Sequence, residues 1–163
     1  MNTFFYLLLI YIIFCKVWPY FFYPNYLKKS KIENYPELKE LSSKLTGNSK
    51  LQTVENVYEY MRQTYSGNDD VLKIENLLSV FNFGDFSTKG ILDKKIFLWC
   101  HGQNRLLKSV LINTGLFKDD DITIQKRLFT SFFIHQWLVI NIDDKKIKVD
   151  PYYNIFNKEL VNL

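Results

Sequence analysis

The spacing of apolar residues changes from a helical period to a strand period along this chain. In the first two thirds, apolar residues recur every three to four positions, which is typical of amphipathic helices. This pattern predicts a short helix opening at Pro36, one helix over about 51–65, one over about 71–81 and one ending at Gly115. Residues 82–93 contain two glycines and little periodicity, and are predicted to form a loop.

The last third of the chain is predicted to be β-structure. A strand is expected over about 122–129, and a tail follows over residues 152–163. Between them, alternating apolar and polar residues from Ile134 to Ile142 predict the first strand of a hairpin, with a polar turn over residues 143–146 and a second strand over 147–149. Helices followed by an antiparallel sheet indicate an α+β fold.

One face of this hairpin carries residues suited to chemistry. A strand has a period of two, so His135, Trp137 and Val139 share a face. If the turn has an even number of residues, Asp150 lies on that face too, opposite Trp137 or Val139 and close to the imidazole. A histidine beside an aspartate is a base with a group that orients it, and this pair lacks only a nucleophile.

The chain length and composition suit one domain with a sizeable core. It has 163 residues, of which 47% are hydrophobic and 17% aromatic. The formal charge of +4 is mild, and the lysines are scattered. No phosphate-binding glycine loop or nucleic-acid motif is present, so no nucleic-acid partner is expected.

The N-terminal segment over residues 1–23 is almost wholly apolar. A membrane-spanning helix needs about 20 apolar residues, so the segment predicts a single-pass membrane anchor, with the side of the membrane left open. A cleaved signal peptide and a buried helix are the alternatives. Residues 24–35 read as a charged linker, which leaves residues 36–163 as the functional domain.

The two cysteines of the chain are Cys15, in the apolar segment, and Cys100. Because these two are not expected to meet, Cys100 is a free thiol. It stands at or just before the start of the helix that ends at Gly115, and a helix N-terminus and a nearby imidazolium both lower the pKa of a thiol. Cys100, His135 and Asp150 therefore form a candidate nucleophile, base and orienting group for acyl transfer.

The order of these residues resembles the transglutaminase-like superfamily, which are papain-like cysteine enzymes in circularly rearranged order. The matching pieces are Trp99-Cys100 at a helix start, His135-Gln136-Trp137, and Val149-Asp150-Pro151 on the paired strand. The resemblance covers about Leu51 to Tyr153. It implies a papain-like core, a catalytic triad and an acyl or amide substrate such as a peptide or protein. The superfamily includes peptidases, amidases, acyltransferases and members without known activity.

Other residues near Cys100 have weaker interpretations. Trp99 and Trp137 are candidates for the walls of a substrate cleft or for ordinary core positions. Gln103, one turn into the helix, is a candidate oxyanion donor. His101 is expected to be bonded locally, and the histidine and cysteine spacings do not favour a metal site. No cofactor is expected.

Two functions of different classes follow from the sequence. The first is a membrane-anchored cysteine enzyme that transfers acyl groups or hydrolyses amides through a thioester on Cys100. The second is a catalytically inactive binding module of the same fold at the membrane. Bulky residues before Cys100, where family members usually carry a glycine, leave room for the second. A purely structural membrane protein is a third possibility, and it predicts no cleft above Cys100.

Overall fold

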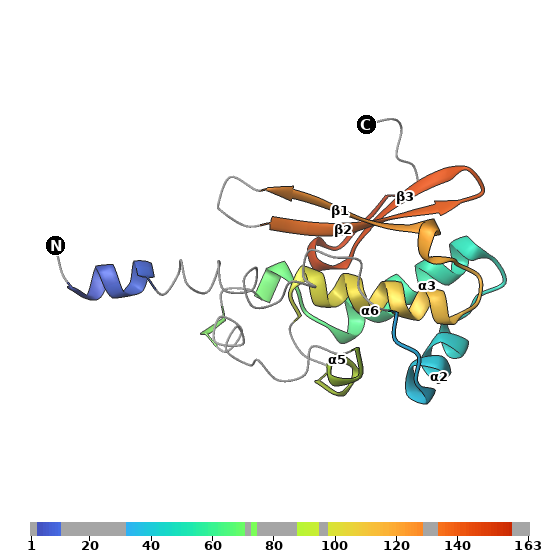
Figure 1. Cartoon of the computed structure of the whole chain (residues 1–163), viewed down its shortest axis with the longest axis horizontal. Helices are drawn as coiled ribbons and strands as arrows, with labels where there is room; N and C mark the ends of the chain where they lie inside the picture. Colours follow the sequence, from blue (N-terminus) through green and yellow to red (C-terminus); the bar gives the residue numbers. More distant parts are fainter. Residues whose placement is uncertain are drawn as a thin grey trace.

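The computed structural model describes residues 3–10, 32–70, 73–74, 88–94, 98–128 and 134–157. The sheet lies along one side of the two longer helices, α3 (Lys50–Thr64) and α6 (Cys100–Asn113). The shorter helices α2 (Pro36–Leu45) and α5 (Thr88–Lys94) lie on the other side of α6 (Figure 1). The predicted α+β class with a small antiparallel sheet is therefore confirmed.

Three of the described helices have a recognisable start or stop residue at one end. The described helices after residue 31 are α2 (Pro36–Leu45), α3 (Lys50–Thr64), α5 (Thr88–Lys94) and α6 (Cys100–Asn113). Proline opens α2, where its missing N–H costs nothing. The Ser49 hydroxyl accepts a hydrogen bond from the Gln52 amide at 3.1 Å and caps α3. Gly115, with φ of +77°, ends α6 as the sequence predicts.

The sheet is an antiparallel meander in the order β1-β2-β3-β4. Its strands are β1 (Ile122–Leu128), β2 (Ile134–Ile142), β3 (Lys145–Asp150) and β4 (Ile155–Asn157). Short 3₁₀ turns precede β1, separate β3 from β4 and follow α3: η4 (Asp119–Asp121), η5 (Pro151–Tyr153) and η2 (Asn68–Asp70).

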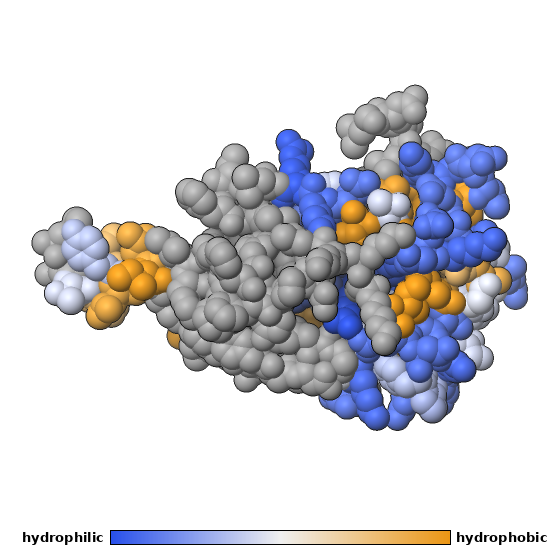
Figure 2. Space-filling model, viewed as in Figure 1, coloured by the Kyte–Doolittle hydropathy of each residue, from blue (hydrophilic) through white to orange (hydrophobic). Residues whose placement is uncertain are grey.

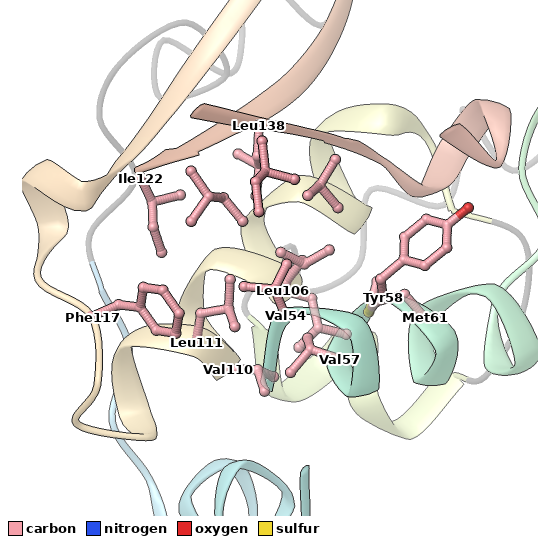
Figure 3. Packing of buried hydrophobic residues seen from close by; sticks show 14 of the residues in the cluster. Val54, Val57, Tyr58, Met61, Leu106, Val110, Leu111, Phe117, Ile122 and Leu138 are labelled. Carbon is pink, nitrogen blue, oxygen red and sulfur yellow. The ribbon is translucent and has the colours of Figure 1, made fainter. Parts of the chain in front are cut away.

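The core lies between the sheet and the helices α3 and α6. The side chains that fill it come from one face of β1, β2 and β3 and from the apolar stripes of both helices (Figure 3). On α3 this stripe is Val54, Val57 and Met61, at the helical spacing seen in the sequence. Hydrophilic residues cover most of the described surface near the sheet, with smaller hydrophobic areas between them (Figure 2).

The prediction of an N-terminal membrane anchor is wrong. Within the described parts of the chain, no helix has the length and apolarity to cross a membrane. Residues 3–10 of the predicted anchor are helical. Residues 11–31, including Cys15, lie outside the described residues.

Two local predictions also need correction. The predicted loop over 82–93 contains α5 from Thr88 onward, while the predicted helix over 71–81 lies almost entirely outside the described residues. The hairpin turn has two residues rather than four, because Ile142 already pairs with Lys145. Asp143 and Asp144 both have positive φ, of 48° and 65°, as a tight hairpin turn of the I′ type requires.

Candidate active site

The two-residue turn fixes which residues of β2 and β3 share a face. Leu138 pairs with Val149, and both lie in the core. One step along this register, Asp150 stands opposite Trp137, on the face that also carries His135. The even turn and the shared face predicted from the sequence are both present.

His135 and Asp150 form a buried pair. The imidazole Nε2 lies 2.6 Å from the Oδ2 atom of Asp150, and these two residues are 6% and 1% exposed. Because a carboxylate only accepts hydrogen bonds, we assign the ring proton of this pair to Nε2, and Nδ1 is then the nitrogen for proton exchange. The other carboxylate oxygen accepts from the Tyr153 amide at 3.4 Å and caps η5. Asp150 is therefore held from both sides.

Cys100 is the first residue of α6 and is 6% exposed. The Trp99 carbonyl accepts hydrogen bonds from the amides of Gly102 and Gln103, at 2.9 and 3.1 Å, which closes the first turn of α6 behind the thiol. Backbone N–H groups at such a start point away from the helix and favour a negative charge there. The predicted helix-start position of Cys100 is confirmed.

Tyr152 lies beside both Cys100 and His135. It forms a small buried cluster with Cys100, against which Trp99 packs. Its ring centroid is 5.9 Å from that of His135. The nucleophile candidate at the start of α6 and the buried pair on the sheet therefore flank the same tyrosine, although they are 35 residues apart in sequence.

Aromatic rings surround the imidazole of His135. The Trp137 ring stacks on it with centroids 5.8 Å apart and planes inclined by 28°. The Tyr153 ring meets it edge-on at 4.5 Å. Together with the Asp150 carboxylate, these contacts restrict rotation of the imidazole, which is what a positioned base needs.

The surroundings of both tyrosines of η5 raise their pKa above the ordinary phenol value. Burial raises the pKa of Tyr152, and the neighbouring Cys100 adds to that effect, because an ionised phenol and a thiolate repel each other. Burial also raises the pKa of Tyr153, with further contributions from Asp150 and Cys100. Phenols of this kind act as neutral hydrogen-bond donors near neutral pH.

Gln103 links the residue before Trp99 to the loop after α3 by hydrogen bonds. Its side chain is fully buried, and Nε2 donates to the carbonyls of Ser66 and Leu98, both at 3.0 Å. An amide group has two N–H donors, so none remains for an oxyanion. The other predicted cleft residues, Trp99 and Trp137, are half-buried beside Cys100 and His135 respectively.

The loop after α3 contacts both halves of the site. Besides the bond from Gln103, the Ser66 carbonyl accepts one from the Leu98 amide at 3.2 Å. The neighbouring Gly67 lies so close to η5 that a Cβ atom there would be 2.5 Å from the Tyr152 carbonyl oxygen. This loop therefore positions the residues before α6 relative to the residues after β3.

Sequence reasoning missed three residues of this arrangement: Tyr152, Tyr153 and Gly67. The aromatic pair directly after Asp150-Pro151 was a usable signal, because residues that follow a site aspartate are carried close to the site. Gly67 gave no such signal, since a glycine after a helix has an ordinary explanation as a helix stop.

His101 follows Cys100 in α6 and is kept neutral by its surroundings. Burial, reinforced by the Arg105 guanidinium, lowers the pKa of His101 to about 3, so its imidazole is neutral at ordinary pH. Across the part of the chain that the structure describes, no three His, Cys, Asp or Glu side chains converge as a metal site would require.

Comparison of the chain with protein-family models, with curated proteins and with solved structures gave no significant match. The geometry of the site is therefore the basis for a function.

Proposed function

We propose that this chain is a cysteine enzyme of the transglutaminase-like type, which transfers acyl groups or hydrolyses amides through a thioester on Cys100. The observation that carries this proposal is the buried contact between His135 Nε2 and Asp150 Oδ2, in the same aromatic cluster as a cysteine at a helix start. A base, an orienting carboxylate and a nucleophile at a helix start are the parts that thiol-based acyl transfer requires.

In the proposed reaction, the Cys100 thiol transfers its proton to Nδ1 of His135. The thiolate then attacks the substrate carbonyl, and backbone N–H groups at the start of α6 stabilise the oxyanion. The tetrahedral intermediate collapses, the C–N bond breaks, and the imidazolium protonates the leaving amine. The thioester remains on Cys100. Water or a second amine, deprotonated by His135, attacks the thioester and releases the thiol.

Asp150 does not take up a proton in this scheme. Its carboxylate holds the imidazole in the tautomer that leaves Nδ1 available, and it stabilises the imidazolium that forms. The stacked ring of Trp137 and the edge-on ring of Tyr153 restrict rotation of the imidazole. The choice between hydrolysis and transamidation depends on whether water or an amine reaches the thioester.

An activated ester such as p-nitrophenyl acetate tests the proposal without a known substrate. In a Cys15→Ser background, Cys100 is the sole cysteine, so an acetyl group found by intact-mass and peptide mass spectrometry reports on it alone. We expect acetylation of Cys100 with turnover, no adduct in Cys100→Ala, and acetylation slowed by at least about 100-fold in His135→Gln. Equal acetylation rates with and without His135 contradict the proposal.

A catalytically inactive binding module is the second candidate. Burial of Cys100, at 6% exposed, favours it. So does an open polar hollow of about 450 Å³ at the hairpin turn, away from Cys100, which is lined by Lys50, Asp121, Asn141, Asp143, Asp144 and Lys146. Under this alternative, p-nitrophenyl acetate leaves Cys100 unmodified although the protein is folded.

A further inference from the structure

The face of the sheet that carries His135 and Asp150, here called the outer face, is rich in positive charge. Residues paired across an antiparallel sheet share a face. Arg127 pairs with His135, Lys148 with Val139, and Lys146 with Asn141, so all three cations lie on the outer face. In the described strands, the one carboxylate on this face is that of Asp150, and its Oδ2 atom is already bonded to His135.

Two of these cations lie beside the proposed base. Arg127 is exposed and directly opposite His135, where paired Cβ atoms lie about 4.5–5.5 Å apart. Lys148 Nζ lies 4.6 Å from the centre of the Trp137 ring, which itself stacks on His135. This ammonium is thus within about 10 Å of the imidazole, comparable with the screening length at 0.1 M salt.

The third cation serves as an internal reference. Lys146 pairs with Asn141, which is six positions along β2 from His135. At about 3.4 Å per residue this is about 20 Å from the imidazole, well beyond the screening length. The electrostatic potential at His135 therefore depends on where the charges lie on this face, rather than on the overall charge of +4.

We propose that the site takes acyl substrates with a carboxylate next to the reacting carbonyl, as in an acidic peptide, and that Arg127 and Lys148 bind this carboxylate. This inference rests on the proposed thiol chemistry, because it describes the group that approaches Cys100. A guanidinium and an ammonium on either side of the base recognise a carboxylate by paired charge-assisted hydrogen bonds. They also raise the local concentration of anionic substrates.

Two alkylating reagents test this preference without a known substrate. Iodoacetate and iodoacetamide react with thiols in the same way, but only iodoacetate is negatively charged. In the Cys15→Ser background, we expect the ratio of the iodoacetate rate to the iodoacetamide rate to exceed that of N-acetylcysteine several-fold and to fall as salt is added. Arg127→Gln and Lys148→Gln should each lower the ratio about two- to fourfold. Arg127→Glu should lower it further.

The controls separate this inference from the proposed function. Lys146→Gln removes the same charge from the same face and should leave the ratio unchanged. An iodoacetamide rate that still depends on His135, together with a ratio equal to that of N-acetylcysteine, overturns the carboxylate preference and leaves the thiol chemistry standing. A ratio above that of N-acetylcysteine, together with an iodoacetamide rate that does not depend on His135, contradicts the proposed enzyme function instead.

The nature of the anionic partner is tested by protection. A short oligoglutamate peptide should slow iodoacetamide labelling of Cys100, and an oligoglutamine peptide of the same length should not. Protection by an oligonucleotide but not by oligoglutamate overturns the assignment to acidic peptides, and so does equal protection by both peptides.

Discussion

Replacement of Gly67 by alanine should lower the reactivity of Cys100, although Gly67 is not one of the three proposed catalytic residues. The added Cβ would lie 2.5 Å from the carbonyl oxygen of Tyr152 and 3.0 Å from its Cα atom, where ordinary contact begins at 3.4 Å. Both atoms belong to the backbone, so no side chain can rotate out of the way. The loop after α3 and the turn η5 must therefore separate by about 0.9 Å, which is the order of strain that costs about 1–3 kcal/mol.

This separation moves the residue that contacts Cys100. Tyr152 follows Asp150 by two positions and packs against Cys100, so a shift of η5 disturbs the alignment of the proposed triad. Displacements near 1 Å cost on the order of 10- to 100-fold in rate when reacting groups depend on alignment. We expect Gly67→Ala to slow acetylation of Cys100 by about that factor and to lower the free energy of unfolding measured in urea.

Gly102→Ala is the matched control. A Cβ at Gly102 meets only side-chain atoms of Ile91 and Leu98, at 3.8 Å, which is ordinary contact. Alanine is favoured over glycine by up to about 1 kcal/mol in a helix, and by less in the first turn where Gly102 lies, so this variant should be at least as stable as the wild type. A Gly67→Ala protein with wild-type stability and wild-type acetylation would refute the role assigned to this close approach.

Four further outcomes are expected. Asp150→Asn should slow acetylation of Cys100 by on the order of 10²- to 10⁴-fold in single-turnover assays while circular dichroism stays native, because the amide no longer enforces the useful tautomer of His135; a native rate contradicts this role. His101 is neutral when folded, with its pKa lowered to about 3, but binds a proton below about pH 6.5 when unfolded. Wild-type stability should therefore fall as pH drops from about 6.5 toward 3, by at most about 1.4 kcal/mol per pH unit, and urea titrations of His101→Gln should lack this component; identical pH profiles refute it. Lys108→Met should lower the free energy of unfolding by about 1–3 kcal/mol. Lys108 Nζ donates to the Ile122 carbonyl at 2.9 Å and contacts Asp119 Oδ1 at 2.6 Å, so it links α6 to the start of β1. An unchanged urea midpoint would contradict this role. Glu33→Gln should cost about 1–2 kcal/mol in the same assay, because the Glu33 carboxylate binds both Arg105 and the Thr88 amide, the latter at 2.8 Å; an unaltered stability shows that an amide replaces it fully.

The elements predicted best are those whose signals are local. Proline opens α2, Ser49 caps the start of α3, and Gly115 follows the end of α6. The shared face of His135 and Asp150 followed from the period of a strand and an even turn. These features depend on neighbours in sequence, so the sequence alone can indicate them.

The elements predicted worst depend on residues far apart in the chain. The helix α5 has weak periodicity, and its first amide is bound by Glu33, 55 residues earlier. Glu33 falls within the predicted linker, yet it also binds Arg105 and, through its carbonyl, Asn113 on α6. No local pattern indicates a cap that comes from so far away.

The candidate site divides in the same way. Cys100, His135 and Asp150 were selected by residue type and order, and the structure places all three around one aromatic cluster. The linking role of Gln103 was not visible, because it depends on a loop carbonyl 37 residues away. The membrane prediction is wrong, since no helix within the described residues is long and apolar enough to cross a membrane.

The most direct test of the proposed triad is the pH dependence of Cys100 alkylation by iodoacetamide in the Cys15→Ser protein. If His135 activates the thiol at the start of α6, the rate should reach half its maximum well below the ordinary thiol value of about pH 8.5. In His135→Gln the midpoint should move back toward that value. A midpoint near pH 8.5 in both proteins would contradict the triad.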